Sequence, residues 1–391
     1  MASVLYGLRK EINKKYYNKG VDMDVMHIGV SVERFKSTFS LGSPSLDFMT
    51  YNSIPEGIFI EIAGPESSGK TTLAFKIASD FIKKEKKKPE EERRHILFVD
   101  AEGTADPDWA KVSSGYDMNS EEVETLYDTP LGASAEEILD DVITSVKSGK
   151  IGLVIFDSLV SIATQQVSDK SMEQKDMGGV AKLLSDFVKR YGGIFRRYRT
   201  TFIGINGLYS AVQAYGNPEQ TAGGKAWKRA CSLRLKTKRG KCYNEDGKEL
   251  NDMEAGAVGH IIEVALLKTK FCRWDRKLGR CHLNYTKGFD VLQDTIEVAT
   301  HFGIIDNVSK GYYVVTDPET GEQLSDKIHG EGNIKPFFEQ HLDVWRRVYD
   351  KVYAMLSNKE NHNDVSFEKM LNIDIEELFG INLAQEAEDN G

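Results

Sequence analysis

The chain of 391 residues is 40% hydrophobic and 28% charged, an ordinary composition for a soluble protein of about two or three domains. Its formal net charge of −9 does not favour nucleic-acid binding as a bulk property, so a nucleic-acid site would have to be a local basic patch on an acidic background. The sequence has no apolar run that could cross a bilayer and no signal-peptide core after Met1, and we therefore expect a cytoplasmic protein.

Residues 1–36 contain one short amphipathic segment. Leu5, Leu8, Ile12 and Tyr16 recur at helical spacing, with lysine and arginine between them. An isolated helix of this length is marginal in water unless its apolar face is covered. We expect this segment to dock either on the protein's own core or on a neighbouring subunit.

A phosphate-binding motif follows at residues 64–72. This stretch fits G-x-x-x-x-G-K-[ST] and consists of Gly64, Pro65, Glu66, Ser67, Ser68, Gly69, Lys70, Thr71 and Thr72. Apolar alternation predicts a buried strand before it, and Leu73, Ile77 and Phe81 predict a helix after it. In this context we expect the loop N–H groups and the helix N-terminus to bind phosphate, Lys70 to reach the β- and γ-phosphates of a nucleotide, and the Thr71 hydroxyl to ligate Mg²⁺.

Three later apolar strands each end in polar side chains. Residues 95–102 end in Asp100 and Glu102, residues 152–157 in Asp157, and residues 200–206 in Asn206. A carboxylate in this position can orient or deprotonate a water beside bound phosphate, with a helix cap as the structural alternative. Asp157 has the form of a Walker B carboxylate, which holds Mg²⁺ directly or through water. Strands that alternate with helices predict an α/β fold with a mostly parallel sheet and a ligand at the strands' carboxyl ends.

Two long polar connections, at residues 164–179 and 208–224, interrupt this pattern, and long loops in a compact domain are usually functional or disordered. Basic residues follow the second connection: Lys225, Lys228, Arg229, Arg234, Lys236, Lys238, Arg239 and Lys241. We expect residues 225–229 to contact phosphate. For residues 238–241 we expect a solvated hairpin instead.

The remainder of the chain contains a strand, a smaller domain and an acidic end. Lys268 and Lys270 close an apolar stretch that begins at Val258, and their spacing places both side chains on one face of a strand. They form either a solvated strand end or an anion site. From about residue 288 the pattern becomes helical and mixed. Residues 374–391 are acidic and predict a flexible tail that can compete electrostatically with an anionic ligand for the basic residues.

The four cysteines are Cys231, Cys242, Cys272 and Cys281. They lack paired C-x-x-C spacing and are typical of reduced intracellular thiols. A zinc site made of Cys272, Cys281 and His282 is an open alternative, and the sequence does not decide whether these thiols bind a metal.

In combination, these segments resemble the bacterial RecA recombinases. Four segments occur in the order of that family over residues 37–290. They are the phosphate loop, Asp100-Ala101-Glu102 with Asp106-Pro107, Gly216-Asn217-Pro218-Glu219 with Gly223-Gly224, and the Lys268/Lys270 pair. The ends of the chain and residues 312–322 are more similar to a phage-encoded, UvsX-like member.

The resemblance implies a RecA-like P-loop ATPase core with a mostly parallel sheet at residues 37–290. It also implies an N-terminal subunit-docking helix within residues 1–36, a small C-terminal α+β domain at 291–373 and an acidic tail at 374–391. ATP and Mg²⁺ are the implied cofactors. The implied activity is that of a DNA-dependent ATPase that polymerises on single-stranded DNA and promotes homologous pairing and strand exchange.

The resemblance also implies individual roles. Glu102 would activate the hydrolytic water and Lys70 would bind the phosphates. Asp106 and Trp109 would hold adenine. Asp157 would organise Mg²⁺ together with Thr71, and Lys268 and Lys270 would reach the γ-phosphate bound by a neighbouring subunit. The implied DNA contacts are Met177, Lys182, Val212, Gly223, Gly224 and Lys225.

One position departs from the family. The family has Asn-Gln at the end of the fourth strand, where the glutamine senses the γ-phosphate and couples it to the second DNA-binding loop. Here the pair is Asn206-Gly207, and glycine has no side chain for that contact. The coupling between ATP and DNA then uses another group, such as Tyr209 or Gln213, or is weaker than in the family.

The expected partners are single- and double-stranded DNA, further copies of the chain in a helical filament, and mediator and single-strand-binding proteins. One alternative is a hexameric helicase on the same core, which the second DNA-binding loop and the lysine pair disfavour. The other is a non-catalytic recombinase paralogue or loader, which the intact Lys70, Glu102 and Asp157 disfavour.

Overall fold

The computed structural model describes residues 2–18, 38–125, 134–162, 179–210, 219–245, 247–250, 256–357, 366–371 and 373–390. The chain divides into two units, residues 1–37 and residues 38–391. In the first unit, α1 (Ala2–Tyr17) is the helix that the apolar spacing predicts. Lys14 and Lys15 lie in its last turn, where cations interact favourably with the helix dipole.

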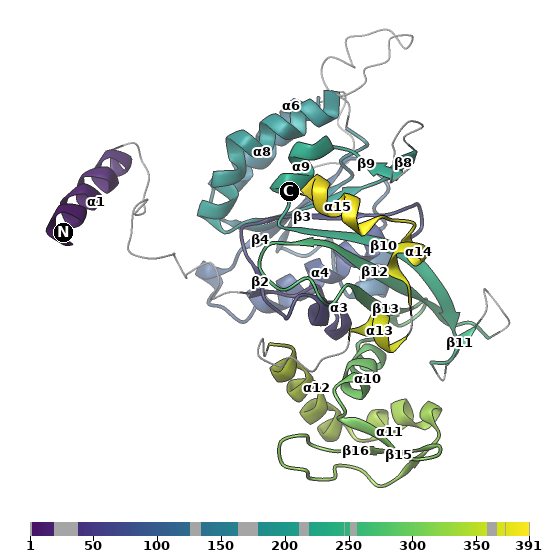
Figure 1. The fold of residues 1–391 in the computed structure, drawn as a ribbon. Helices are drawn as coiled ribbons and strands as arrows, with labels where there is room; N and C mark the ends of the chain where they lie inside the picture. The colour runs from purple at the N-terminus through teal and green to yellow at the C-terminus, as the bar shows by residue number, and fades with distance from the viewer. Residues whose placement is uncertain are drawn as a thin grey trace. The chain divides into compact units, whose positions relative to one another are not determined.

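Among the described residues, a ten-stranded mixed sheet forms the centre of the second unit (Figure 1). Its parallel part contains, in spatial order, β10 (Leu233–Tyr243), β3 (Phe59–Ala63), β7 (Thr201–Asn206), β6 (Ile151–Asp157), β4 (His95–Asp100) and β5 (Val123–Thr125). The antiparallel part continues from β10 with β12 (Gly259–Thr269), β13 (Leu278–Asn284) and β14 (Gly288–Phe289), and β11 (Glu249–Leu250) also pairs with β10. The predicted α/β fold with a mostly parallel sheet is confirmed.

Helices cover both faces of the parallel part because its strands are apolar on both faces. Ile60 and Ile62 of β3 pack in one cluster with Phe75 of α4 (Lys70–Glu85). Phe59 points the other way and packs with residues of α6 (Ala135–Lys147) and α8 (Gly179–Tyr198), two helices that lie on one side of the sheet in Figure 1. Since β3, β4, β6 and β7 are parallel, their carboxyl ends meet at one edge of the sheet, where a ligand is expected.

Short elements complete this part of the unit. They are β1 (Thr38–Phe39), α3 (Pro44–Met49), β2 (Ile54–Pro55), α5 (Pro107–Ser114), β8 (Leu208–Ser210), β9 (Glu219–Thr221) and α9 (Gly224–Ala230). Helix α6 begins with a capping box, in which the Ser134 hydroxyl accepts a hydrogen bond from the Glu137 N–H and the Glu137 carboxylate accepts one from the Ser134 N–H.

Strand β10 differs from its prediction. Residues 238–241, expected in a solvated hairpin, continue β10 antiparallel to β12. Arg234 and Lys236 on this strand are only 1% and 5% exposed, so two cations of the basic stretch that follows the second connection are buried. Because burying an unpaired charge is costly, such a cation needs partners. The Arg234 Nε atom donates to Oε2 of Glu61 at 2.6 Å.

Residues 291–371 add helices and a small antiparallel sheet beside β13 (Figure 1). Their elements are α10 (Val291–His301), β15 (Ile305–Ser309), β16 (Tyr312–Val315), β17 (Ile328–His329), α11 (Ile334–Gln340), α12 (Leu342–Leu356) and α13 (Phe367–Met370). Val298, Phe338 and Val352 belong to one apolar cluster that also includes Leu278 of β13. The region has the helices and strands expected of it, while its boundaries as a domain stay a prediction.

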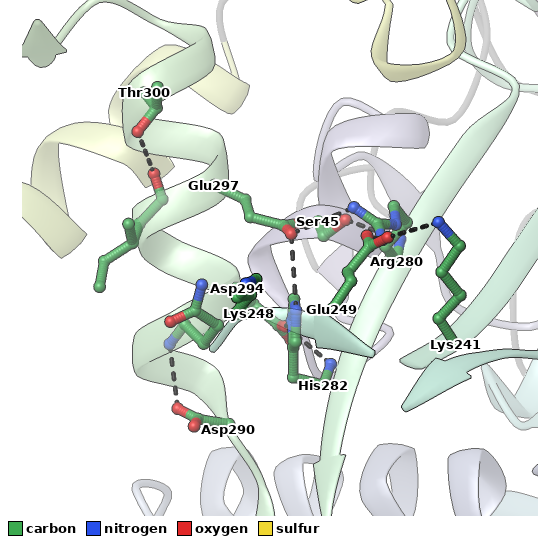
Figure 2. A network of polar contacts seen from close by, with 12 residues as sticks. Ser45, Lys241, Lys248, Glu249, Arg280, His282, Asp290, Asp294, Glu297 and Thr300 are labelled. Atoms are coloured by element: carbon green, nitrogen blue, oxygen red, sulfur yellow. Dashed lines mark hydrogen bonds and ion pairs between the residues drawn. The ribbon is translucent and has the colours of Figure 1, made fainter. Parts of the chain in front are cut away.

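Buried charges join β13 to α10 (Figure 2). His282 Nδ1 lies 2.9 Å from Asp294 and its Nε2 lies 3.5 Å from Glu297. Burial alone lowers the pKa of His282, but the two carboxylates outweigh it and the net shift is upward. Arg280 binds Glu297 at 3.3 Å and also pairs with Glu249. These contacts hold α10 against the edge of the central sheet.

The C-terminal segment corrects the prediction of a flexible acidic tail. Residues 375–379 form α14 (Ile375–Phe379), capped by Asp374, and residues 383–390 form α15 (Leu383–Asn390). Ile375, Phe379 and Ile381 are buried. The acidic composition concealed this amphipathic pattern, although an Asp cap followed by two glutamates is a helix-start signal.

The sheet's most buried carboxylate generates a prediction about stability. Glu61 is fully buried and accepts hydrogen bonds from Asn206 and Trp227 as well as from Arg234. Replacing Glu61 with alanine removes the acceptor of these donors and one of the two carboxylates that Arg234 binds, and we expect the free energy of unfolding to fall by about 3–5 kcal/mol. Urea denaturation measures this loss, with the exposed Glu91→Ala as the control variant.

The same contact has a pH signature. Burial raises the pKa of Glu61, but Arg234 and the hydrogen bonds lower it by more than burial raises it, so the net shift is downward. A carboxylate whose folded-state pKa is lowered stabilises the fold above its unfolded pKa and loses that contribution as pH falls through the folded value. The difference between wild type and Glu61→Ala should therefore shrink in acid. A variant as stable as wild type at pH 7 would contradict this account.

Candidate active site

The phosphate loop is built for close approach to its surroundings. Gly69 has φ +87° and directly precedes α4, and a Cβ at this position would lie 2.7 Å from the side chain of Ile262. A Cβ on Gly64 would lie 2.4 Å from Oγ1 of Thr237. Both positions therefore require glycine. The resulting backbone turn at the start of a 16-residue helix fits a phosphate group.

The charged and hydroxyl groups expected at this loop lie together. Lys70 Nζ donates to the carbonyl of Pro65 at 2.7 Å, and Thr71 Oγ1 donates to Oδ2 of Asp157 at 2.7 Å. Burial raises the pKa of Asp157 to about 6, and the Thr71 hydrogen bond only partly opposes this shift while Glu102 adds to it. Hydroxyl and carboxylate oxygens are the donors that Mg²⁺ prefers. The pair Thr71 and Asp157 therefore fits a magnesium site.

The two carboxylates at the end of β4 have different surroundings. Asp100 accepts hydrogen bonds from the backbone N–H groups of Gly103 and Ala105, at 2.8 and 3.0 Å, and so closes the turn after the strand. Glu102 instead accepts from the hydroxyls of Ser158 and Ser161. Asp100 thus has a structural role, in a turn and not as the helix cap considered from the sequence, whereas Glu102 lies beside the residue that follows Asp157.

The residues expected to hold adenine lie next to the phosphate loop. Asp106 caps α5 and accepts hydrogen bonds from the N–H groups of Asp108 and Trp109. The indole Nε1 of Trp109 donates to Oγ1 of Thr72 in the first turn of α4, at 3.3 Å. The Trp109 ring therefore borders the phosphate loop, and Asp106 orients the helix that carries it.

The end of the second connection is tied to the sheet. Asn206 Nδ2 donates to the carbonyl of Ala222 at 3.0 Å, and the Ala222 N–H donates back to Asn206 Oδ1 at 3.2 Å. Gly223 and Gly224 follow, with φ +93° and +61°. Of the other expected DNA contacts, Lys182 is exposed on α8, while Met177 and Val212 lie outside the described residues.

Lys268 lies in β12 and Lys270 directly after its last residue, Thr269, and both side chains reach the same carbonyl, on the one side that their spacing predicts. Lys268 Nζ donates to the carbonyls of Lys228 and Arg229 at 2.6 and 3.3 Å, and Lys270 Nζ donates to the Arg229 carbonyl at 2.5 Å. Burial and the neighbouring Lys270 charge lower the pKa of Lys268 to about 8. Both ammonium groups thus meet the end of α9, the helix that follows the second connection.

Helix α15 contacts the basic residues that follow the second connection. Asp389 lies 3.4 Å from Lys225 and 3.2 Å from Lys228, and Glu386 lies 2.7 Å from Arg234. The sequence indicated the charge complementarity but not that a folded helix would provide it.

None of the four cysteines, all of which the structure describes, is joined in a disulfide. Cys231, Cys242 and Cys281 are buried thiols, and Cys272 is partly exposed. Among the described residues, no group of three or more His, Cys, Asp and Glu side chains is placed to hold a metal ion.

Within the same residues, no helix is both long enough and apolar enough to span a membrane.

Comparison with known proteins agrees with this arrangement. Residues 5–290 match the family model described as the RecA N-terminal domain. Protein RecA of Mycoplasma mobile is 28% identical over 369 residues, which cover 93% of this chain and 100% of the relative. Protein RecA of Ruminococcus albus is 29% identical over 87% of this chain and 77% of the relative. Protein RecA of Clostridioides difficile is 27% identical over 90% of this chain and 91% of the relative.

The family match spans the phosphate loop, the strand-end carboxylates, the second connection and the lysine pair in one continuous region. The relatives extend the similarity beyond it, to most of the chain. The chain belongs to the RecA family.

Proposed function

We propose that this protein is a DNA-dependent ATPase that forms helical filaments on single-stranded DNA and catalyses homologous pairing and strand exchange in recombination and repair. One observation carries the proposal. Lys70, Thr71, Asp157 and Glu102 gather at the sheet edge from which the two connections implied in DNA binding depart. Nucleotide chemistry and DNA contact would therefore share one edge of the sheet.

In the proposed reaction, the loop N–H groups and Lys70 bind the phosphates of ATP. Thr71 and Asp157 would hold Mg²⁺, which neutralises negative charge on the phosphates when bound. Glu102 takes a proton from water while the water oxygen bonds to the γ-phosphorus and the bond to the β–γ bridging oxygen breaks, releasing ADP and phosphate. Trp109 and Asp106 would form the adenine side of the site.

The assembly is part of the proposal. ATP would sit between subunits, with Lys268 and Lys270 of one subunit reaching the γ-phosphate held by the next, and α1 would dock on a neighbouring subunit. A head-to-tail contact of this kind that does not close produces an open helix. Cytoplasmic location and mediator and single-strand-binding partners complete the proposal. The narrower assignment to a phage-encoded, UvsX-like subtype finds no support among the bacterial RecA relatives and stays a prediction.

Electron microscopy tests the proposed assembly. The protein is mixed with single-stranded DNA and a slowly hydrolysed ATP analogue. Helical filaments are expected. Rings would favour the hexameric helicase, and DNA without regular protein assemblies would favour a non-catalytic paralogue or loader.

Glu102 generates a prediction about hydrolysis. Glu102→Gln should bind ATP and DNA as wild type does but hydrolyse ATP slower by a factor on the order of 10² or more, because the carboxamide does not accept the water proton. Steady-state phosphate release measures this. Glu121→Gln, an exposed position before β5 at the opposite edge of the sheet, serves as control. Near-normal turnover of Glu102→Gln would remove Glu102 from the mechanism.

Lys225 and Asp389 generate opposite predictions about DNA. Lys225→Ala should reduce the slope of log affinity against log salt by about one phosphate contact. Asp389→Asn removes the charge that faces Lys225 and Lys228, so DNA should bind more tightly at low salt, with a gain that shrinks as salt rises. Fluorescence anisotropy with labelled single-stranded DNA measures both effects. An unchanged slope together with an unchanged affinity would place the DNA elsewhere.

Lys268 generates a prediction about pH. A lysine whose pKa is lowered to about 8 carries its charge below that value and loses it as pH rises through it. If assembly needs the charged form of Lys268, the neutral lysine must take up a proton when subunits assemble above pH 8. The assembly constant then falls by up to about tenfold per pH unit. Lys268→Arg keeps its charge, and its assembly should vary little between pH 7 and 9. Light scattering with ATP and DNA compares the two proteins, and equal pH profiles would refute the role of this charge.

A further inference from the structure

The turn at residues 158–161, called here the serine turn, directly follows the strand that ends in Asp157. Ser158 Oγ donates to Oε1 of Glu102 at 2.5 Å, and Ser161 Oγ donates to the same oxygen at 2.9 Å. The two serine oxygens lie 2.8 Å apart. Two hydroxyls of one turn therefore converge on the carboxylate proposed to activate water.

This arrangement orients the carboxylate. Hydrogen bonds to an ionised group are among the stronger ones in proteins. Because both donors bind Oε1, they restrict rotation of the Glu102 carboxylate and direct its other oxygen, Oε2, away from the serine turn. A general base must lie within hydrogen-bond reach of the proton that it removes, so a fixed carboxylate is more effective than a mobile one.

The serine turn is also linked to the second connection. The N–H of Leu159 donates to the carbonyl of Ile205 in β7 at 2.9 Å. The next residue, Asn206, exchanges two hydrogen bonds with Ala222, which precedes Gly223 and Gly224. Three short contacts thus lead from Glu102 to the end of the second connection. Ser161 in turn lies three residues before the first connection, of which residues 164–178 lie outside the described residues.

Gly207 leaves room for this turn. A Cβ placed on Gly207 would meet Val160 at 3.5 Å, so the nearest neighbour of the side-chain-free position is a residue of the serine turn. A long side chain at position 207 would have to share this space with Val160. The serine turn therefore lies next to position 207, where glycine has no side chain to make a contact.

We propose that Ser158 and Ser161 are positioning residues for Glu102, and that the serine turn couples DNA at the two connections to ATP hydrolysis. The inference rests on the proposed function. DNA held at the connections would fix the serine turn, and the serine turn would fix Glu102 while it takes the proton of the attacking water. Neither serine forms or breaks a covalent bond.

A matched pair of variants isolates the hydroxyl. Ser161→Thr and Ser161→Val have nearly the same shape and differ in one hydroxyl group. ATP turnover is measured for each at saturating ATP, with and without saturating single-stranded DNA. We expect the ratio of DNA-stimulated to unstimulated turnover to fall about fivefold or more in Ser161→Val, as loss of one charge-assisted hydrogen bond allows. Ser161→Thr should keep at least half of the wild-type ratio, and the KM for ATP should change little in both.

Two controls accompany the pair. Ser148→Ala removes an exposed hydroxyl after α6, at the opposite edge of the sheet, and should leave the ratio unchanged. In the Glu102→Gln background, Ser161→Val should have little further effect, because the carboxylate it orients is gone. Thermal melting of each variant shows that the ratio reports on folded protein.

The outcomes separate the two claims. Equal ratios for Ser161→Thr and Ser161→Val, or an undiminished effect of Ser161→Val in the Glu102→Gln background, would overturn the role of the serine turn. Wild-type protein whose turnover does not respond to DNA would instead refute the proposed function, whatever the variants do.

Discussion

The buried carboxylate of Glu61 connects more of the structure than any other side chain described above. It lies on β3, directly before the phosphate loop, and binds Asn206 at the end of β7, Trp227 of α9 and Arg234 of β10. An ionised carboxylate with no access to water requires these donors, since an unpaired buried charge costs several kcal/mol. The position of the phosphate loop relative to the second connection follows from this requirement.

Arg234 extends the same constraint to the C-terminus. Its guanidinium binds Glu61 on one side and Glu386 of α15 on the other. Next to it, Asp389 faces Lys225 and Lys228, and Lys236 donates to the Phe379 carbonyl. The acidic end of the chain and the basic residues after the second connection therefore neutralise each other in this structure. DNA contact by Lys225 would have to compete with Asp389, a competition that weakens with salt.

The nucleotide edge of the sheet combines groups with unequal freedom. Asp100 is occupied with closing a turn, and Thr71 is bound to Asp157. Within the part of the chain that the structure describes, Glu102 accepts hydrogen bonds from two hydroxyls of a single turn. Away from this edge, where the end of β12 pairs with the start of β10, Lys268 and Lys270 bind carbonyls at the end of α9 rather than a carboxylate, which leaves their positive charge uncompensated by that contact. In the proposed assembly, Glu102 of one subunit and the lysine pair of its neighbour would act on the same nucleotide.

Local patterns in the sequence determined the fold class, the phosphate loop, the polar ends of the strands and the shared face of Lys268 and Lys270. Each of these depends on spacing within one element or on the parallel direction of neighbouring strands. Only the tertiary structure decided that Arg234 is buried, that residues 238–241 continue a strand, that α14 and α15 are helices packed on the core, and that the serines after Asp157 meet Glu102. These depend on charge pairs and hydrogen bonds between residues far apart in the chain, which no local periodicity records.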